Sequence, residues 1–214
     1  MIIGNLVEIA EAHLGAPVKN ACVSVPAYFD YAQRQATRDA CRIAGINVLR
    51  ICSTSADASV AYALQEIIEE RPGKDKEKNV LFFDIGGSSV EASVAVIESG
   101  IVEIRAVIGH PHLGGEDFDD NMILHFIKHF KRKHRKDLTT DARALCRLRA
   151  ACERAKLELS SATETCISIE NLHCGIDFHD SISRAQFEEM NMTLFKKALA
   201  PIEMVCCEFS SDSD

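Results

Sequence analysis

The sequence predicts an α/β protein built in two parts, on the basis of three observations. Strand-like and helix-like segments alternate over the first part of the chain, which is typical of a mostly parallel sheet covered by helices. A charged segment that contains a proline and a glycine, Arg71–Lys78, then interrupts the pattern. Beyond it come consecutive strand-like segments and amphipathic helices. The 214 residues suffice for one large domain or two smaller subdomains.

The first part begins with a segment of helical apolar spacing that stops at Gly15. A β-prone run ends at Pro26, and Asp30 with Gln33 three residues later resembles a capping box. Gly45 is a natural stop for the helix that this box starts. The elements expected here are helix 6–14, strand 21–25, helix 30–44, strand 47–52 and helix 57–70.

The second part is expected to start with a β-meander and to continue with helices. A helix should follow Gly115, because apolar residues repeat every four positions, and this stripe should be core. A later helix, over about 140–161, has apolar residues at spacings of three and four. The stripes are Phe118, Met122, Phe126 and Phe130 in the first helix and Leu145, Leu148, Cys152, Ala155 and Leu159 in the second. The other expected elements are strands 79–84, 90–97 and 101–108, two strands around Cys174-Gly175, a helix from near Ser183 and a frayed tail at 210–214.

The composition is that of an ordinary soluble protein, with 47% hydrophobic and 26% charged residues. The net charge of −8 argues against general nucleic-acid binding. We therefore expect no nucleic-acid partner. No apolar run approaches the ~20 residues that span a bilayer, and the N-terminus has no secretory signal, so we expect no membrane partner either. Nine cysteines form no Cys-x-x-Cys pair, and we interpret most as small buried side chains in a reducing, cytoplasmic compartment. The basic run Lys131–Lys136 has two interpretations, a nuclear signal or anion patch and a solvated helix end.

The stretch Asp84-Ile85-Gly86-Gly87-Ser88-Ser89-Val90-Glu91 suits phosphate and metal chemistry. A β-prone run delivers an acid into a turn of two glycines and two hydroxyl residues. Glycine lets the backbone approach a phosphate, successive amides form an anion-binding nest, and the carboxylate can reach a metal ion or its water. An ordinary β-hairpin turn is the alternative. The residues alone leave both interpretations open.

A second glycine pair, Gly114-Gly115, stands before a helix start, where backbone amides attract anions. Acidic residues from Glu116 onward already occupy the helix dipole, so a self-capped helix is an equal alternative. His125 and His129 have a spacing that can bind zinc, without the glutamate of the metalloprotease pattern.

The helix over 140–161 has a polar face opposite its apolar stripe. Glu153, Lys156 and Ser160 fall on it at spacings of three and four, with Leu157 as its apolar member. These groups could hydrogen-bond a heterocycle or a ribose. A solvated surface with a Glu153–Lys156 pair is the alternative.

Six motifs in chain order extend the interpretation. They are Val25-Pro26-Ala27-Tyr28-Phe29, Gln33-Arg34-Gln35-Ala36-Thr37, Asp84-Ile85-Gly86-Gly87, Leu113-Gly114-Gly115-Glu116-Asp117-Phe118-Asp119, Phe130-Lys131-Arg132-Lys133-His134 and Cys152-Glu153-Arg154-Ala155-Lys156. From about Ile9 to Glu203 the chain closely resembles the ATPase domain of the seventy-kilodalton heat-shock chaperone family. The resemblance implies an incomplete actin-like ATPase fold, whose two lobes close on Mg-ATP. Residues 1–73 would form part of the first lobe, 74–113 and 192–214 the base of the second lobe, and 114–191 its upper subdomain.

The resemblance also implies roles for the candidate residues. Asp84 matches the acid that works through magnesium-bound water and is the expected metal site. Together with Ser89, beside the terminal phosphate, and Glu91, the next acid of the turn, it forms the expected catalytic set. The residues expected to bind ATP or ADP are Gly86, Gly87, Ser88, Gly114, Gly115, Glu116, Glu153, Lys156 and Ser160. The implied partners are nucleotide-exchange factors and J-domain co-chaperones.

Several residues depart from the family's pattern. Ser88 replaces a third glycine, which adds a Cβ where the backbone needs close approach or unusual dihedral angles. Glu91 replaces an Asp and would misplace a water or metal by about a bond length. Thr54-Ser55 replaces an acid-proline pair, which removes a metal-shell carboxylate, and Leu157 replaces an arginine that stacks on adenine. His110-Pro111 replaces an Asp-Thr pair.

Other parts of the family's machinery are expected to be missing. The first phosphate turn and its lysine would precede Met1, the third glycine turn would follow Asp214, and no peptide-binding domain is present. Phosphoryl transfer needs several such elements together, so we expect weak ATP binding and little hydrolysis, and enzyme activity stays open. The alternatives are a non-catalytic module that docks co-chaperones and a non-functional fragment with unmatched strand edges.

Overall fold

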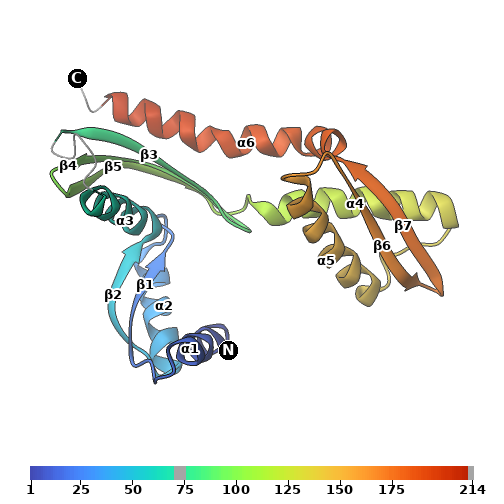
Figure 1. The fold of residues 1–214 in the computed structure, drawn as a ribbon, viewed down its shortest axis with the longest axis horizontal. Helices are drawn as coiled ribbons and strands as arrows, with labels where there is room; N and C mark the ends of the chain where they lie inside the picture. The colour runs from blue at the N-terminus through green and yellow to red at the C-terminus, as the bar shows by residue number, and fades with distance from the viewer. Residues whose placement is uncertain (70–75, 212–214) are drawn as a thin grey trace. The chain divides into compact units, whose positions relative to one another are not determined.

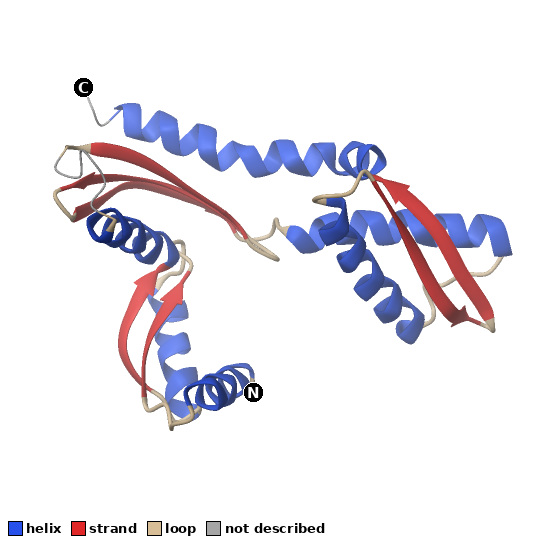
Figure 2. Ribbon diagram, viewed as in Figure 1, coloured by secondary structure: helices blue, strands red, loops and turns tan. Residues whose placement is uncertain are grey.

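The computed structural model describes residues 1–69 and 76–211 and divides the chain into two compact units. Unit 1 comprises Met1–Asp84, Glu91–His110 and Pro201–Asp214, and unit 2 comprises Ile85–Val90 and Pro111–Ala200. Both units combine helices with strands (Figures 1 and 2), which confirms the α/β class. Among the described helices, none has the length and apolar character needed to cross a bilayer.

The first part of unit 1 alternates helices and strands as expected. Its strands β1 (Asn20–Val25) and β2 (Asn47–Ser53) pair in parallel, which confirms the parallel arrangement. The capping box is present, because Asp30 Oδ1 accepts from the Gln33 amide at 2.8 Å and Gln33 Oε1 accepts from the Asp30 amide at 2.9 Å. The elements are α1 (Ile2–Leu14), β1 (Asn20–Val25), α2 (Tyr31–Ile43), β2 (Asn47–Ser53) and α3 (Thr54–Ile68).

Helix α3 begins three residues earlier than predicted. Ser53 is its N-cap, and the Ser53 hydroxyl accepts from the Ala56 amide at 3.3 Å. A serine at this position satisfies an otherwise unpaired amide of the first helical turn. The earlier start places Thr54 on the first turn of the helix.

The meander is confirmed, because its three strands lie side by side in chain order. It consists of β3 (Lys78–Ile85), β4 (Val90–Glu98) and β5 (Ile101–His110). In unit 1 its core combines Ala92, Val94 and Ala106 with Val205, which lies in the C-terminal part of helix α6 (Arg184–Ser211) (Figure 1). Most of the predicted linker over 71–78, and the last three residues of the predicted frayed tail, lie outside the described residues.

Unit 2 packs two helices, α4 (Gly115–His134) and α5 (Ala142–Leu159), with the antiparallel hairpin of β6 (Glu164–His173) and β7 (Ile176–Ser183). The predicted aromatic stripe of α4 is buried, and Phe126 and Phe130 are fully enclosed. Both rings pack against Phe178, with centroid distances of 5.6 and 6.1 Å. The stripe of α5 is buried except for the half-buried Leu145, so both periodicity predictions hold.

The interpretation of the cysteines as mostly buried residues is wrong. Of the nine, all free, only Cys41 and Cys152 are buried, and six are exposed. Strand alternation explains one case, since Cys166 lies between the buried Thr165 and Ile167 and therefore faces outward. Burial raises the pKa of the Cys152 thiol to about 12, which makes this cysteine unreactive at neutral pH.

Candidate functional site

The glycine turn belongs to unit 2 and has consecutive free amides. The Gly86 amide donates to the Ser89 carbonyl at 2.8 Å and closes the turn. Among the described residues, the amides of Gly87 and Ser88 have no hydrogen-bond acceptor. The buried Val90, which packs with Leu113, anchors the end of the turn. Successive unpaired amides on a glycine turn are the basis of an anion-binding nest.

The second glycine loop lies directly against this turn. The Gly115 amide donates to the Gly86 carbonyl at 2.9 Å, and the Glu116 amide donates to the Gly87 carbonyl at 2.8 Å. The Gly114 amide donates to Asp117 Oδ2 at 2.8 Å, as in the self-capped alternative. A Cβ on Gly114 would lie 2.4 Å from the Gly87 oxygen, so only glycine fits there. The first amides of α4 thus hold the turn in place, and their contact with a nucleotide stays a prediction.

The two acids of the turn region lie in unit 1 and differ in their surroundings. Asp84 is exposed, and its carboxylate has no polar partner among the described residues. Glu91 is 8% exposed; its Oε2 accepts from the Ala27 amide at 2.9 Å and its Oε1 from the Thr54 hydroxyl at 3.0 Å. Both acids line a cavity of about 250 Å³ that also contains Thr54 and Ser55. Asp84 is therefore the carboxylate free to take a cation or its water.

Lys156 on α5 has protein partners for its ammonium group. Its Nζ donates to Asp119 Oδ2 at 2.6 Å and to the Gly115 carbonyl at 3.0 Å. The side chains of Lys156 and Asp119 are 22% and 7% exposed, so this is a largely buried ion pair. The alternative of a solvated Glu153–Lys156 pair is therefore wrong. Lys156 instead connects α5 to the start of α4.

A cavity of about 560 Å³ in unit 2 places Lys156 and Ser160 together with residues that sequence reasoning missed. Arg184 and Glu188 of α6 line it, and Phe118, Leu159, Phe187, Met192 and Phe195 provide apolar walls. The Arg184 guanidinium donates to the Leu159 carbonyl at 2.8 Å, which joins α6 to the end of α5. Aromatic walls with a few polar groups suit a planar heterocycle. Glu153 is not among the residues that line this cavity.

The residues 1–212 match the family model described as Hsp70 protein. The chain belongs to the Hsp70 family. It is 51% identical to a heat shock 70 kDa protein of Neurospora crassa over 99% of this chain and 32% of that protein. It is 52% identical to a heat shock 70 kDa protein of Emericella nidulans over 96% of this chain and 31% of that protein. It is 48% identical to the putative heat shock 70 kDa protein 7 of Homo sapiens over 95% of this chain and 54% of that protein. The chain thus spans about a third of the length of the two fungal relatives.

Membership of the Hsp70 family confirms the predicted fold, an incomplete actin-like ATPase fold, and identifies the chain as part of the family's nucleotide-binding domain. Within this Hsp70 chain, the two replacements Glu91 and Thr54 contact each other. The longer side chain of Glu91 accepts a hydrogen bond from the Thr54 hydroxyl. Ser88 is not among the residues with positive φ, so its Cβ meets no left-handed strain, and the effect of this replacement on a phosphate stays a prediction.

We expect Glu91→Asp, which shortens this side chain by one methylene, to destabilise the Hsp70 chain by about 1–2 kcal/mol. The shorter carboxylate would no longer reach both the Ala27 amide and the Thr54 hydroxyl. Urea-induced unfolding measures the change. Thr54→Val removes one of the two bonds and should have a smaller effect, and equal stability of Glu91→Asp and the unchanged chain would contradict this role for Glu91.

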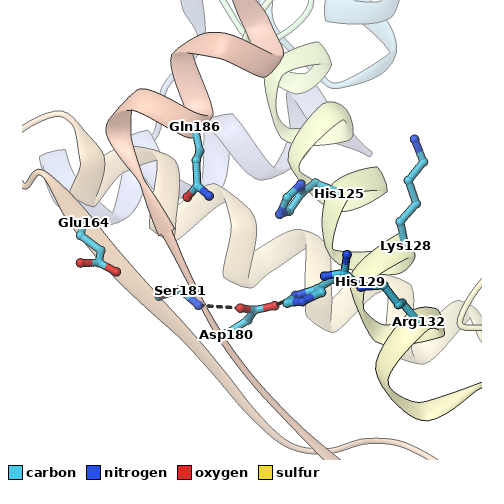
Figure 3. Close-up of a pocket in the computed structure, with 8 residues that line it drawn as sticks. All are labelled: His125, Lys128, His129, Arg132, Glu164, Asp180, Ser181 and Gln186. Carbon is cyan, nitrogen blue, oxygen red and sulfur yellow. Dashed lines mark hydrogen bonds and ion pairs between the residues drawn. The ribbon is translucent and has the colours of Figure 1, made fainter.

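The zinc hypothesis for the histidines of α4 gains no support. His129 Nδ1 forms an ion pair with Asp180 Oδ2, beside His125 on the same helix face (Figure 3). Burial and the nearby His129 charge lower the pKa of His125. Over residues 1–69 and 76–211 no group of three His, Cys, Asp or Glu side chains is arranged to hold a metal. The surrounding cavity of about 600 Å³ also contains Lys128 and Arg132, which disfavour a cation.

Proposed function

We propose that this chain binds an adenine nucleotide with Mg²⁺, weakly and with little hydrolysis, as part of a heat-shock chaperone of the cytoplasm. One observation supports it above all. In an Hsp70-family chain, the turn that matches the phosphate motif has two successive amides, of Gly87 and Ser88, with no protein acceptor in the described structure. Such a pair is suited to a phosphate oxygen.

The proposed roles of the other residues follow from their surroundings. The free carboxylate of Asp84 can hold Mg²⁺ through its water, and the ion would neutralise phosphate charge when bound. Ser89 would lie near the terminal phosphate. Lys156 and Ser160 line a cavity that suits an adenosine ring, and we propose Glu153, Gly114, Gly115 and Glu116 as further contacts.

Weak hydrolysis is proposed because the charged groups of Glu91 and Lys156 already have protein partners. Both oxygens of Glu91 accept hydrogen bonds from unit 1, and Lys156 neutralises Asp119. Neither group can respond to a developing charge without losing these partners, and preorganised charge is the main source of phosphoryl-transfer rate. Thr54, at the family's acid position, has no charge to contribute.

Thermal unfolding with millimolar Mg-ATP or Mg-ADP tests the binding. A ligand that binds only the folded chain at about ten times its Kd stabilises it by ~1.4 kcal/mol, so we expect a measurable rise in Tm. Asp84→Asn is the matched variant: it should leave the ligand-free Tm unchanged, because Asp84 has no partner, and should reduce the magnesium-dependent part of the rise. Absence of any rise with either nucleotide would refute the proposal.

A second candidate function is a non-catalytic module that docks co-chaperones. The hydrogen bonds of Glu91 and Lys156 to protein partners favour this function, because these side chains then stabilise the fold and do not take part in a reaction. A pull-down with a nucleotide-exchange factor and with a J-domain, with and without Mg-ATP, separates the two functions. Binding that is insensitive to nucleotide and to Asp84→Asn supports docking alone.

The assignment of the lobes stays a prediction: residues 1–73 to the first lobe, 74–113 with 192–214 to the base of the second lobe, and 114–191 to its upper subdomain.

A further inference from the structure

The turn of the β6–β7 hairpin presents a cysteine to solvent. His173 pairs with Ile176 across the two strands, so Cys174 and Gly175 form a two-residue loop. Both have positive φ, 51° and 77°, as a type I′ turn requires. The Cys174 thiol is exposed on this turn. A small reagent can therefore reach the sulfur without any opening of the fold.

An imidazole lies beside this sulfur and is itself oriented by a carboxylate. Cys174 Sγ is 3.3 Å from His173 Nε2, and His173 Nδ1 is 2.9 Å from Asp141 Oδ2. The His173 ring also contacts Phe130 edge-on at a centroid distance of 6.4 Å, and its side chain is 15% exposed. Thiol, imidazole and carboxylate thus follow one another in the order of an activated nucleophile, its base and an orienting group.

The orienting carboxylate is held by the start of a helix. Asp141 is the N-cap of α5, and its Oδ1 accepts from the amides of Arg143 and Ala144 at 3.1 and 3.0 Å. The hydrogen bond from His173, together with these amides, lowers the pKa of Asp141, so the carboxylate is ionised at neutral pH. An ionised carboxylate only accepts, and His173 Nδ1 must therefore carry the proton of the neutral ring. Nε2 is then the acceptor that faces the Cys174 thiol.

We propose that Cys174 is a nucleophilic thiol that small disulfides modify, with His173 as its base and Asp141 as a positioning residue. His173 Nε2 takes the thiol proton, and the Cys174 sulfur attacks one sulfur of the disulfide. The disulfide bond breaks as the new mixed disulfide forms, and the departing thiolate receives the proton from His173. Cys174 is oxidised, and the reagent is reduced to one thiol. The exposed turn leaves the Cys174 sulfur within reach of such small disulfides.

Two other cysteines of unit 2 serve as internal references. Cys146 and Cys166 are exposed as Cys174 is, and neither has an imidazole partner in the described structure. An ordinary cysteine is only a few per cent thiolate at pH 7, so proton transfer to a neighbouring base can raise its reactivity about tenfold or more. The ratio of Cys174 modification to that of the references isolates this effect from global changes of the fold.

The experiment exposes the whole chain to oxidised glutathione at pH 7 and quantifies each modified cysteine by peptide mass spectrometry. We expect Cys174 to react about tenfold faster than Cys146 and Cys166. His173→Gln should reduce the ratio to about one. Asp141→Asn should do the same although asparagine remains a good N-cap, because its amide NH₂ favours the imidazole tautomer that has the proton on Nε2. Thermal unfolding checks that both variants fold.

A pH series distinguishes activation from a merely structural role. A thiol without a neighbouring base gains reactivity as the pH rises from 7 to 9. The ratio of Cys174 modification to that of the references should therefore fall with rising pH in the unchanged chain and stay flat in Asp141→Asn. The titratable groups in contact with the thiol and its base are His173 and Asp141. Equal rates at all three cysteines, or an unchanged ratio in both variants, would overturn the proposal.

Discussion

Gly114→Ala is expected to destabilise unit 2 by about 3 kcal/mol. The added Cβ would lie 2.4 Å from the Gly87 carbonyl oxygen and 2.6 Å from the Ser88 nitrogen, which are backbone atoms of the neighbouring turn. Neither atom can move without breaking the hydrogen bonds that Gly115 and Glu116 donate to the turn. The two loops would therefore separate, and the free amides proposed for phosphate would lose their arrangement. Urea-induced unfolding of the whole chain measures the loss.

Alanine at Gly86 and at Gly87 gives matched controls within the same site. A Cβ at these positions meets its nearest atoms at 3.5 and 3.8 Å, which are ordinary contact distances, and neither residue has positive φ. Both variants should stay within about 1 kcal/mol of the unchanged chain, because propensity effects of Gly→Ala are of that size. A loss at Gly114→Ala no larger than at Gly86→Ala would show that the close approach of the loops is not needed for stability.

Lys156→Met is expected to destabilise the chain by about 3 kcal/mol. The substitution keeps the length of the side chain and removes its charge. Asp119, only 7% exposed, would then keep an ionised Oδ2 without a partner, and its Oδ1 is already buried without one. A buried charge left without its counter-ion is among the most destabilising single changes. Urea unfolding again measures the effect.

Two further variants separate the ion pair from other causes. The double variant Lys156→Met with Asp119→Asn should recover most of the stability, because the uncompensated charge is gone. Glu153→Ala, one turn earlier on the same helix and exposed, should change stability by no more than about 0.5 kcal/mol. If Lys156→Met were as mild as Glu153→Ala, the salt bridge would not be a structural element of unit 2.

Local signals account for the part of the fold that could be predicted. The capping box at Asp30, the aromatic stripe of α4 and the glycine turns act over a few residues, so spacing alone reveals them. The predicted start of α3 is three residues late, because Ser53 caps the helix and Thr54 begins it. The motifs in chain order suffice to predict the Hsp70 family, and with it the actin-like fold.

The candidate site was predicted as a set of residues but not as a set of contacts. Sequence spacing suggested a Glu153–Lys156 pair, whereas the ammonium of Lys156 lies at Asp119, 37 residues away. Glu91 is predicted as a member of the catalytic set, and its carboxylate accepts from the Ala27 amide, 64 residues away, a contact that spacing does not reveal. Arg184 was not proposed at all, because only the packing of α6 against α5 brings it to the cavity.

Patterns along the chain predict which segments are helices and strands, which family the chain belongs to and which residues are candidates for a nucleotide. These depend on local periodicity, caps and motifs, all of which are read along the chain. The three-dimensional packing of the chain sets which amides and carboxylates are free, which cysteines are exposed and that Asp141, His173 and Cys174 meet. Short-range spacing does not encode these features, because a side chain's partners depend on contacts between residues far apart in the chain.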